Sequence, residues 1–399
     1  MLTISTVVTK IRNFIPKLGD EVALGDLYNP KNNAFDFFRF LLASLVIYSH
    51  AYPLLYGTSV PERFAKITFG QETFGGLAVA GFFCISGFLV TQSFLHSSSY
   101  ITYLIKRFLR LFPALIVSSF VTAFVLGPIL SGFSLRDYIF GNYGESPFGY
   151  FVKNSTMNIL GYSYTLRDLF TNNPYPLAVN GSLWTIKHEF VAYIMVMGLG
   201  FFSIFKHKKL LLAFTGLSIF LYYANHISGF MLWNLESPRW WAFHTVEYPF
   251  LIKLISFFLL GAVLYVLKDN IFFSWKFLLL AIFIFFLSIP LKVYQYVALF
   301  TLPYIIISMS IKWKFHKFGQ YGDFSYGIYI YAFPIQQTVA YFFSTRIHSA
   351  ALFAMISFFP TLVLAILSWK YVEEPALKLK AKIQKITTTK KENFVFSRE

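Results

Sequence analysis

The sequence predicts an all-α membrane protein with about ten transmembrane helices. Three observations support this prediction: 56% of the 399 residues are hydrophobic, only 13% are charged, and the mean hydropathy is +0.58. A soluble domain carries roughly a quarter charged residues, so this composition excludes an ordinary water-exposed surface. The apolar residues are also gathered in runs of about 20, the length that crosses a bilayer as a helix.

Apolar segments follow one another from residue 35 to residue 370. Each is near the length of a membrane-spanning helix. The predicted spans are residues 35–56, 74–95, 109–130, 182–205, 209–227, 249–268, 274–290, 294–311, 322–343 and 350–370. An even number of spans places both termini on the same side of the membrane.

The 34 Lys and Arg residues are distributed unevenly between the two sides. Most fall in the segments that share a side with the termini, including a Lys-rich stretch after residue 370. By the positive-inside rule this side is cytoplasmic, so we predict that both termini are cytoplasmic. The net charge of +16 then orients the protein and attracts anionic lipid headgroups. A nucleic-acid partner is not needed to explain the charge.

Three regions are predicted along the chain. Residues 1–32 lack the apolar core and cleavage site of a secretory signal, and we expect a cytoplasmic or interfacial segment. Residues 33–376 form one membrane domain. Within this domain, residues 131–181 make an outer loop rich in Gly, Asn, Pro and Tyr, and ordered loops of that length are usually functional. Residues 377–399 form a basic cytoplasmic tail.

The first predicted span contains two ionisable groups that are costly in hydrocarbon. Arg39 and His50 are eleven residues apart, and eleven steps of 100° return to within about 20° of the same helix face. Asp36, one turn before Arg39, is the expected partner of its guanidinium group. Ionisable groups inside spans are functional candidates by default. The alternative is that Arg39 reaches the inner headgroups and His50 bonds a neighbouring helix.

A second basic pair lies at the inner start of the third span. Arg107 and Arg110 are three residues apart, so their guanidinium groups occupy neighbouring positions where planar forks can hold a phosphate. A basic start to a span is also what membrane topology requires.

The stretch NGSLWTIKHEF opens the fourth span from the outer side. Glu189 follows Ser182 by seven residues and is therefore about 10 Å further into the membrane. This depth matches that expected for His50, which suggests a polar chamber in the outer half of the bilayer. Lys187 is expected to reach up to the interface.

Two further stretches have structural interpretations. In GQYGDFSYGIYIYAFP, Asp323 and Ser325 are in positions of N-cap residues, and Tyr326 begins a tyrosine stripe typical of membrane interfaces. Cys84 and Ser86 lie in GFFCISGFLV and form a small-residue face that suits close helix contact. A single cysteine and scattered histidines provide neither a disulfide framework nor a metal-ligand set, so no metal is expected.

Together these motifs resemble the acyltransferase-3 family of polytopic membrane O-acyltransferases, which in bacteria acylate surface glycans. The resemblance covers about residues 33–376. The matching motifs, in order, are DFFR (36–39) with His50 eleven residues later, FFCISGF (82–88), RFLR (107–110) before Phe112-Pro113, GSLWTIKHE (181–189), GDFSYGIYIY (322–331) and SWKYVEEP (368–375). Ala80 replaces an acidic residue of many members, and many lack Lys187-His188; these departures concern the substrate more than the reaction.

The resemblance implies transfer of an acyl group, usually acetyl from cytoplasmic acetyl-coenzyme A, to a hydroxyl of an extracytoplasmic or lipid-linked glycan. Arg107 and Arg110 would hold the coenzyme A phosphates, with Arg39 next on the path. His50 would act as general base or carry the acyl group itself, and Glu189 would orient its imidazolium. The residues expected along the substrate path are Trp184, Ser182, Asp36 and Tyr326. The bacterial inner membrane is the expected location.

Two alternatives use the same buried polar residues. A membrane transporter also places Arg, His and Glu on facing helices, but it predicts repeats in matching halves of the chain. No such symmetry is visible in the sequence. A lipid-linked glycan polymerase also combines many spans with a large outer loop, but it needs no coenzyme A, so acetyl-coenzyme A would leave its stability unchanged.

Overall fold

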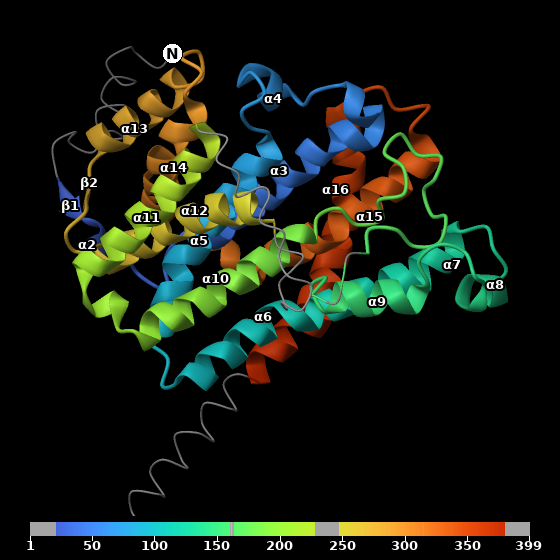
Figure 1. Cartoon of the computed structure of the whole chain (residues 1–399), viewed down its shortest axis with the longest axis horizontal. Helices are drawn as coiled ribbons and strands as arrows, with labels where there is room; N and C mark the ends of the chain where they lie inside the picture. The colour runs from blue at the N-terminus through green and yellow to red at the C-terminus, as the bar shows by residue number, and fades with distance from the viewer. Residues whose placement is uncertain (1–20, 160, 162, 228–246, 314, 380–399) are drawn as a thin grey trace, which may run out of the picture.

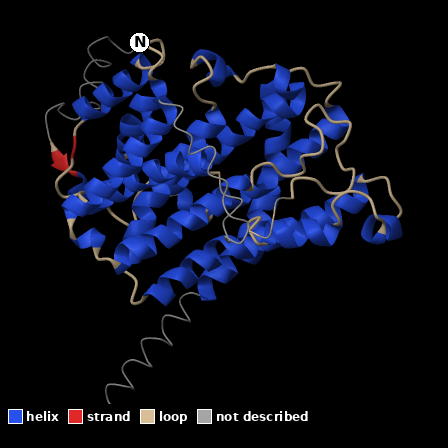
Figure 2. Ribbon diagram, in the orientation of Figure 1, coloured by secondary structure: helices blue, strands red, loops and turns tan. Residues whose placement is uncertain are grey.

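The computed structural model describes residues 21–159, 161, 163–227, 247–313 and 315–379. These residues form a bundle of long helices that cross one another at varied angles (Figure 1). Helix dominates this part of the chain (Figure 2), so the predicted all-α class is confirmed. The only sheet within it, which was not predicted, pairs β1 (Val22–Ala23) antiparallel with β2 (Phe272–Phe273).

A helix lies at each of the ten predicted spans. Two of them, α3 (Phe35–Tyr56) and α5 (Phe74–Leu95), have the predicted bounds. The others are α6 (Tyr100–Val121) continued by the π-helical η2 (Thr122–Leu126) and α7 (Gly127–Leu130), α10 (Trp184–Phe201), α11 (Lys208–Ile227), α12 (Tyr248–Val266), α13 (Trp275–Leu287), α14 (Tyr294–Lys312), α15 (Ser325–Phe343), and α16 (Ala350–Ser368) continued by the π-helical η6 (Trp369–Glu373). Shorter helices connect them: α2 (Leu24–Leu27), η1 (Gly57–Ser59), α4 (Arg63–Ile67), α8 (Leu135–Phe140), α9 (Pro147–Ser155), η3 (Ile204–Lys206) and η5 (Phe318–Tyr321).

Several of these helices have the length and composition of membrane spans. Among the described residues, six helical segments qualify: Phe35–Ser59, Phe74–Leu95, Tyr100–Leu130, Tyr248–Val266, Tyr294–Lys312 and Ala350–Leu379; α13 is apolar but shorter. The chain is therefore an integral membrane protein, whereas the number of ten spans and the cytoplasmic termini stay predictions. Most of the two predicted terminal segments lies outside the described residues.

The starts of two helices illustrate how local sequence defines them. Thr73 precedes α5 as its N-cap residue, and its hydroxyl accepts a hydrogen bond from the backbone N–H of Gly76 at 2.9 Å. At α15 the N-cap residue is Phe324, so the prediction that Asp323 and Ser325 are N-caps is wrong. One carboxylate oxygen of Asp323 still accepts hydrogen bonds from the backbone N–H of Ser325, at 3.2 Å, and from its hydroxyl. The other oxygen bonds two residues that are distant in the sequence, Arg39 and Arg110.

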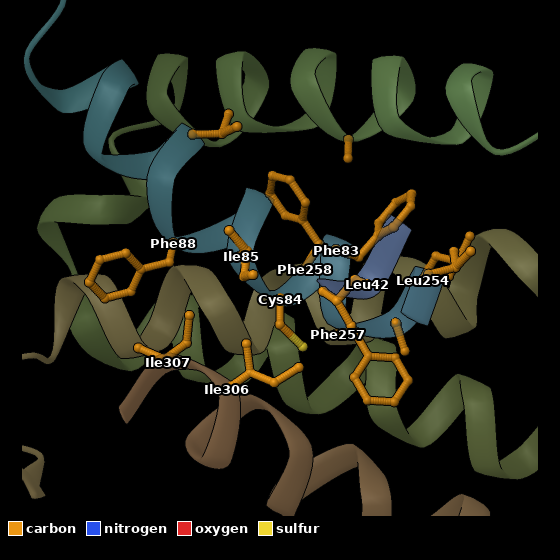
Figure 3. Close-up of a cluster of buried hydrophobic side chains, with 14 of the residues drawn as sticks. Leu42, Phe83, Cys84, Ile85, Phe88, Leu254, Phe257, Phe258, Ile306 and Ile307 are labelled. Atoms are coloured by element: carbon orange, nitrogen blue, oxygen red, sulfur yellow. The ribbon is translucent and has the colours of Figure 1, made fainter. Parts of the chain in front are cut away.

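Helices α5 and α12 pack backbone to backbone at two glycines. A Cβ atom at Gly87 of α5 would lie 1.9 Å from the carbonyl oxygen of Phe258, and one at Gly261 of α12 would lie 2.1 Å from that of Cys84. The predicted close helix contact is therefore confirmed at Cys84 and the neighbouring Gly87, whereas Ser86, predicted on the same face, points to α10 and donates a hydrogen bond to Glu189 at 3.2 Å. Figure 3 shows Cys84 within the apolar core beside the labelled side chains of α12 and α14: Phe257, Phe258, Ile306 and Ile307.

Replacing Gly87 by alanine is expected to lower the free energy of unfolding by about 1–3 kcal/mol, because the two backbones must separate to admit a methyl group. Gly198 in α10 provides the matched control, since a Cβ atom there would meet nothing within 4 Å. Alanine at that helical position should be neutral or stabilising by up to about 1 kcal/mol. Thermal unfolding in detergent measures both variants, and equal midpoints would contradict the close contact.

The described residues of the predicted outer loop are joined to α8 and α15 by hydrogen bonds. Arg167, which is only 3% exposed, donates hydrogen bonds to the backbone carbonyls of Tyr138 at 2.8 Å and Tyr143 at 2.6 Å. These bonds hold the later part of the loop against α8. Gln337 of α15 donates to two more carbonyls of the loop, those of Tyr175 at 2.8 Å and Ala178 at 2.7 Å. The end of the loop is thereby placed directly before α10.

Candidate active site

Four mostly buried charges meet where α3, α6, α15 and η6 come together. Asp323 pairs with Arg39 of α3 and, at 2.6 Å, with Arg110 of α6. Arg110 also lies 3.5 Å from Glu373 of η6. Asp36, the predicted partner of Arg39, is at 4.0 Å, so Asp323 is the closer partner. We refer to Arg39, Arg110, Asp323 and Glu373 as the ion cluster.

Two members of the ion cluster were not predicted as site residues. Asp323 was interpreted as a helix cap, and Glu373 was named only within a family motif. A count of charges could have found them, because arginines buried in a membrane domain need carboxylate partners. Glu373 is also the last residue of a π-helical segment, and such segments occur frequently at functional sites.

A small inner cavity of about 40 Å³ lies beside the ion cluster. Its lining includes Arg39, Ser86 of α5 and Glu189 of α10. The carboxylate of Glu189 accepts hydrogen bonds from Ser86 at 3.2 Å and from the hydroxyl of Tyr193. In this state the cavity has room for a few water molecules at most, so any larger ligand would have to widen it.

A much larger outer cavity, of about 650 Å³, lies on the side predicted to be external. Its lining includes His50, Trp184, Glu62, Glu72 and Lys253. The ammonium group of Lys253 donates a hydrogen bond to the carboxylate of Glu72 at 2.6 Å. This volume is in the range of small-molecule sites, and the mixture of aromatic and charged groups is typical of sites that orient a polar ligand.

The imidazole of His50 rests edge-on against the ring of Phe333, with 5.2 Å between ring centroids. Its Nδ1 atom is buried and has no hydrogen-bond partner among the described residues. Glu189, which was expected to orient this ring, lines the inner cavity and bonds Ser86 and Tyr193 instead. The two residues therefore face different cavities in this structure, although both belong to the same polar interior.

The cavities adjoin one another. Val79 of α5 and Tyr329 of α15 line both the inner and the outer cavity. Trp184 and Phe250 line the outer cavity and also a third cavity of about 580 Å³, to which the end of the outer loop, residues 175–178, contributes. Three neighbouring cavities with shared lining residues thus follow one another from the ion cluster, past His50, to the outer loop.

The third predicted arginine, Arg107, has a different environment from Arg39 and Arg110. It donates to the hydroxyl of Ser93 at 3.2 Å, and its guanidinium carbon lies 6.0 Å from the ring centre of Tyr103 and 5.5 Å from that of Tyr193. Its Nε atom is buried without a hydrogen-bond partner among the described residues. Among the described residues, the guanidinium group of Arg107 therefore contacts one hydroxyl and two aromatic rings.

The residues predicted along the substrate path are spread over the site. Trp184 borders the outer cavities, and Tyr326 borders the inner one while donating to the carbonyl of Leu111 at 2.8 Å. Ser182 is fully buried, and its hydroxyl has no hydrogen-bond partner in the described part of the chain. Lys187 is only 1% exposed, so the expectation that it reaches the interface is wrong.

Metal binding has no visible site in the described ranges, where no three His, Cys, Asp or Glu side chains lie together in a way that could hold an ion. Cys84, the single cysteine, is fully buried in the apolar core. The chemistry available to this interior is that of guanidinium and ammonium groups, carboxylates, hydroxyls and imidazoles, which suits phosphate binding, proton transfer and charge stabilisation.

Comparison with known proteins identifies the family. The model of the acyltransferase-3 family, described as an acyltransferase domain, matches residues 32–370. The chain is 30% identical over 365 residues to an O-acetyl transferase of Shigella phage Sf6, covering 86% of this chain and 96% of the relative. It is 27% identical over 383 residues to nodulation protein 10 of Rhizobium leguminosarum bv. viciae, covering 88% and 95%. No solved structure gave a significant match. Because the family model spans most of the chain, the protein belongs to the acyltransferase-3 family of membrane O-acyltransferases.

Proposed function

We propose that the protein transfers an acetyl group from cytoplasmic acetyl-coenzyme A to a hydroxyl of a glycan, lipid-linked or otherwise extracytoplasmic, at a bacterial cytoplasmic membrane. The main support is the meeting of the inner and outer cavities at Val79 and Tyr329. Arginines lie at one end of this route and His50 at the other. Such a route lets a donor and an acceptor from opposite sides of the membrane meet within the protein. The likeness to a phage O-acetyl transferase favours acetyl as the group.

The donor end is assigned to Arg107, Arg110 and Arg39. Guanidinium groups bind phosphate through paired hydrogen bonds. Arg110 and Arg39 already share Asp323, so a phosphate there has to exchange with a carboxylate or add to it. A phosphate that binds Arg107 would not have to displace a carboxylate, because the contacts of Arg107 among the described residues are Ser93 and two tyrosine rings. Arg107 is therefore the principal phosphate ligand in this proposal.

The transfer itself is assigned to His50. The acetyl thioester enters from the inner cavity and the acceptor hydroxyl from the outer one. In direct transfer, the imidazole takes the proton of the hydroxyl as its oxygen attacks the thioester carbon, the carbon–sulfur bond breaks, and the proton passes to the leaving thiolate. In the covalent alternative, an imidazole nitrogen of His50 first attacks the thioester carbon and coenzyme A leaves as its thiol. The acceptor hydroxyl then attacks the acetyl-imidazole, takes the acetyl group and loses its proton as the imidazole is released. Glu189 would stabilise the imidazolium from the inner cavity rather than through a direct hydrogen bond.

The acceptor end is assigned to the outer cavity and its extension beneath the outer loop. Trp184, which borders both, offers an aromatic face for the apolar side of a sugar ring. Glu72 and Lys253 offer a charged acceptor and donor for sugar hydroxyls. Ser182, buried just before Trp184 with a hydroxyl that has no partner among the described residues, would offer a further hydrogen bond to a bound sugar.

Acetyl-coenzyme A is expected to stabilise the purified protein against thermal unfolding. A ligand at a hundred times its dissociation constant adds about 2.7 kcal/mol. Arg107→Ala should abolish most of this gain. Arg136→Ala on the exposed side of α8 is the matched control and should respond like the native chain. Single substitution of Arg107 is preferred because Arg110 also holds the ion cluster together.

Free coenzyme A should stabilise the native chain to a similar extent, since the proposed contacts are with its phosphates. If neither ligand moves the unfolding temperature of the native chain, the donor site is refuted. A transporter or a glycan polymerase would then account better for the buried polar residues. If Arg107→Ala and Arg136→Ala lose the response equally, binding is not at the proposed arginine.

A further inference from the structure

Tyr329 occupies the junction between the inner and outer cavities. It lines both of them, and its hydroxyl is hydrogen-bonded to that of Thr185 at 2.6 Å, with either atom able to be the donor. Thr185 also lines the inner cavity. Both side chains are largely buried, at 8% and 5% exposure. A pair of hydroxyls is therefore located where a donor and an acceptor from the two cavities would meet.

The position of Tyr329 is set by its neighbours on both sides. Its ring packs edge-on against Phe82 of α5, with 6.0 Å between centroids. Phe333, one turn further along α15, contacts the imidazole of His50. Residues four apart on a helix lie on the same face, so Tyr329 and the residue that supports His50 point to the same side of α15. Tyr329 thus borders the His50 cavity while its hydroxyl bonds a residue of the Glu189 cavity.

The hydroxyl groups of Tyr329 and Thr185 together have one hydrogen that their mutual hydrogen bond does not use. Two hydroxyl groups hold two hydrogens between them, and the bond that joins them uses one. If Thr185 donates to the oxygen of Tyr329, the phenolic hydrogen is free to bind another acceptor. Tyr326, the next tyrosine toward the ion cluster, differs in this respect because its hydroxyl already donates to the backbone carbonyl of Leu111.

We propose that Tyr329, supported by Thr185, donates a hydrogen bond to the thioester carbonyl oxygen during acyl transfer. This proposal rests on the proposed function. When the acceptor oxygen bonds to the thioester carbon, negative charge develops on the carbonyl oxygen, and it returns to the carbon as the carbon–sulfur bond breaks. A preorganised donor in a water-poor site stabilises that charge most in the transition state. In this scheme His50 accepts the proton of the acceptor hydroxyl, and Tyr329 stabilises the negative charge on the carbonyl oxygen.

The test compares tyrosine-to-phenylalanine changes at two buried positions of α15. Tyr329→Phe removes the hydroxyl and keeps the ring against Phe82. It should lower kcat by about 10²–10³-fold, as loss of one such donor does elsewhere, with KM for acetyl-coenzyme A within about twofold of native. Tyr331→Phe is the matched control because Tyr331 is buried to 6% exposure but borders neither of the two cavities described above; its kcat should stay near native.

Substitutions at Thr185 test the supporting role. Thr185→Ser keeps the hydroxyl and should retain most of the activity. Thr185→Val removes the hydroxyl that supports Tyr329, so it should lower kcat, but by a smaller factor than Tyr329→Phe does. For every variant the thermal shift with acetyl-coenzyme A is measured in parallel and should remain native, which shows that the protein is folded and binds its donor.

The outcomes separate this inference from the function on which it rests. If the native protein transfers acetyl and Tyr329→Phe keeps kcat within about threefold, the role of Tyr329 is refuted and the proposed function stands. The same conclusion follows if Tyr331→Phe loses as much activity as Tyr329→Phe. If the native protein binds no acetyl-coenzyme A and transfers no acetyl group, the proposed function fails and this inference fails with it.

Discussion

Replacement of His50 by glutamine is expected to lower acetyl transfer by about 10²–10⁴-fold, the usual contribution of a general base. Glutamine keeps a polar side chain of similar reach in the outer cavity but cannot take a proton at neutral pH. The measurement is release of the coenzyme A thiol from acetyl-coenzyme A in the presence of a glycan acceptor. The thermal shift with acetyl-coenzyme A should be preserved, because the donor phosphates are assigned to Arg107 and its neighbours.

His348→Gln is the matched control, since His348 is an exposed histidine on the same predicted side of the membrane. Its activity should equal that of the native chain. Retention of full activity by His50→Gln would remove the imidazole from the mechanism. Loss of the acetyl-coenzyme A shift in this variant would instead place His50 in donor binding.

The same variant separates the two possible roles of His50. The native chain is incubated with acetyl-coenzyme A in the absence of acceptor, and its mass is then measured. An acyl carrier gains one acetyl group, which the His50→Gln chain cannot gain, and releases an equivalent of coenzyme A. A general base shows no added mass in either chain.

Replacement of Asp323 by asparagine is expected to destabilise the protein by about 3–5 kcal/mol, the cost of removing one partner from a buried ion pair. The exposed fractions of the side chains support this expectation: 11% for Asp323, 19% for Arg39 and 13% for Arg110. Asparagine leaves the two guanidinium groups facing each other with Glu373 and the more distant Asp36 as their remaining counter-charges. Unfolding of the purified protein in detergent, by heat or denaturant, measures the loss.

Asp269→Asn provides the control for this prediction. Asp269 also pairs with a lysine, Lys268, at 3.2 Å, but its side chain is 70% exposed, and exposed pairs contribute little. The free energy of unfolding of the Asp269→Asn protein should stay within about 0.5 kcal/mol of that of the native protein. If Asp323→Asn is no less stable than Asp269→Asn, the ion cluster does not hold α3, α6 and α15 together as described.

The positions of the helices followed from the sequence to a large extent, because the thickness of the bilayer imposes runs of about 20 apolar residues. Residues 35–56 and 74–95 match α3 and α5 in full. The third span illustrates where this reasoning failed. It was predicted to begin at residue 109, whereas α6 begins at Tyr100. Lys106 and Arg107 interrupt the apolar run, but both residue types are good helix formers, so α6 continues through them.

The candidate site was only partly predictable. Arg39 and His50 were recognisable because charged or titratable groups are rare in apolar segments. The depth of Glu189 was derived from helix rise, which fixes distance along one axis but not the direction in which a side chain points. Its carboxylate turned out to bond Ser86, 103 residues earlier in the chain.

The sequence alone therefore establishes the membrane class, the approximate helix positions and a short set of buried polar residues, since each depends on local composition. The tertiary structure decided their partners. Asp323 bonds Arg39 across 284 positions of the chain, and Tyr329 lines two cavities that are formed by several helices. Such pairings depend on how closely and at what angle the helices pack. That packing is set by contacts between distant residues. The small residues around Gly87 indicate a contact face, but they do not indicate that its partner is the backbone of Phe258.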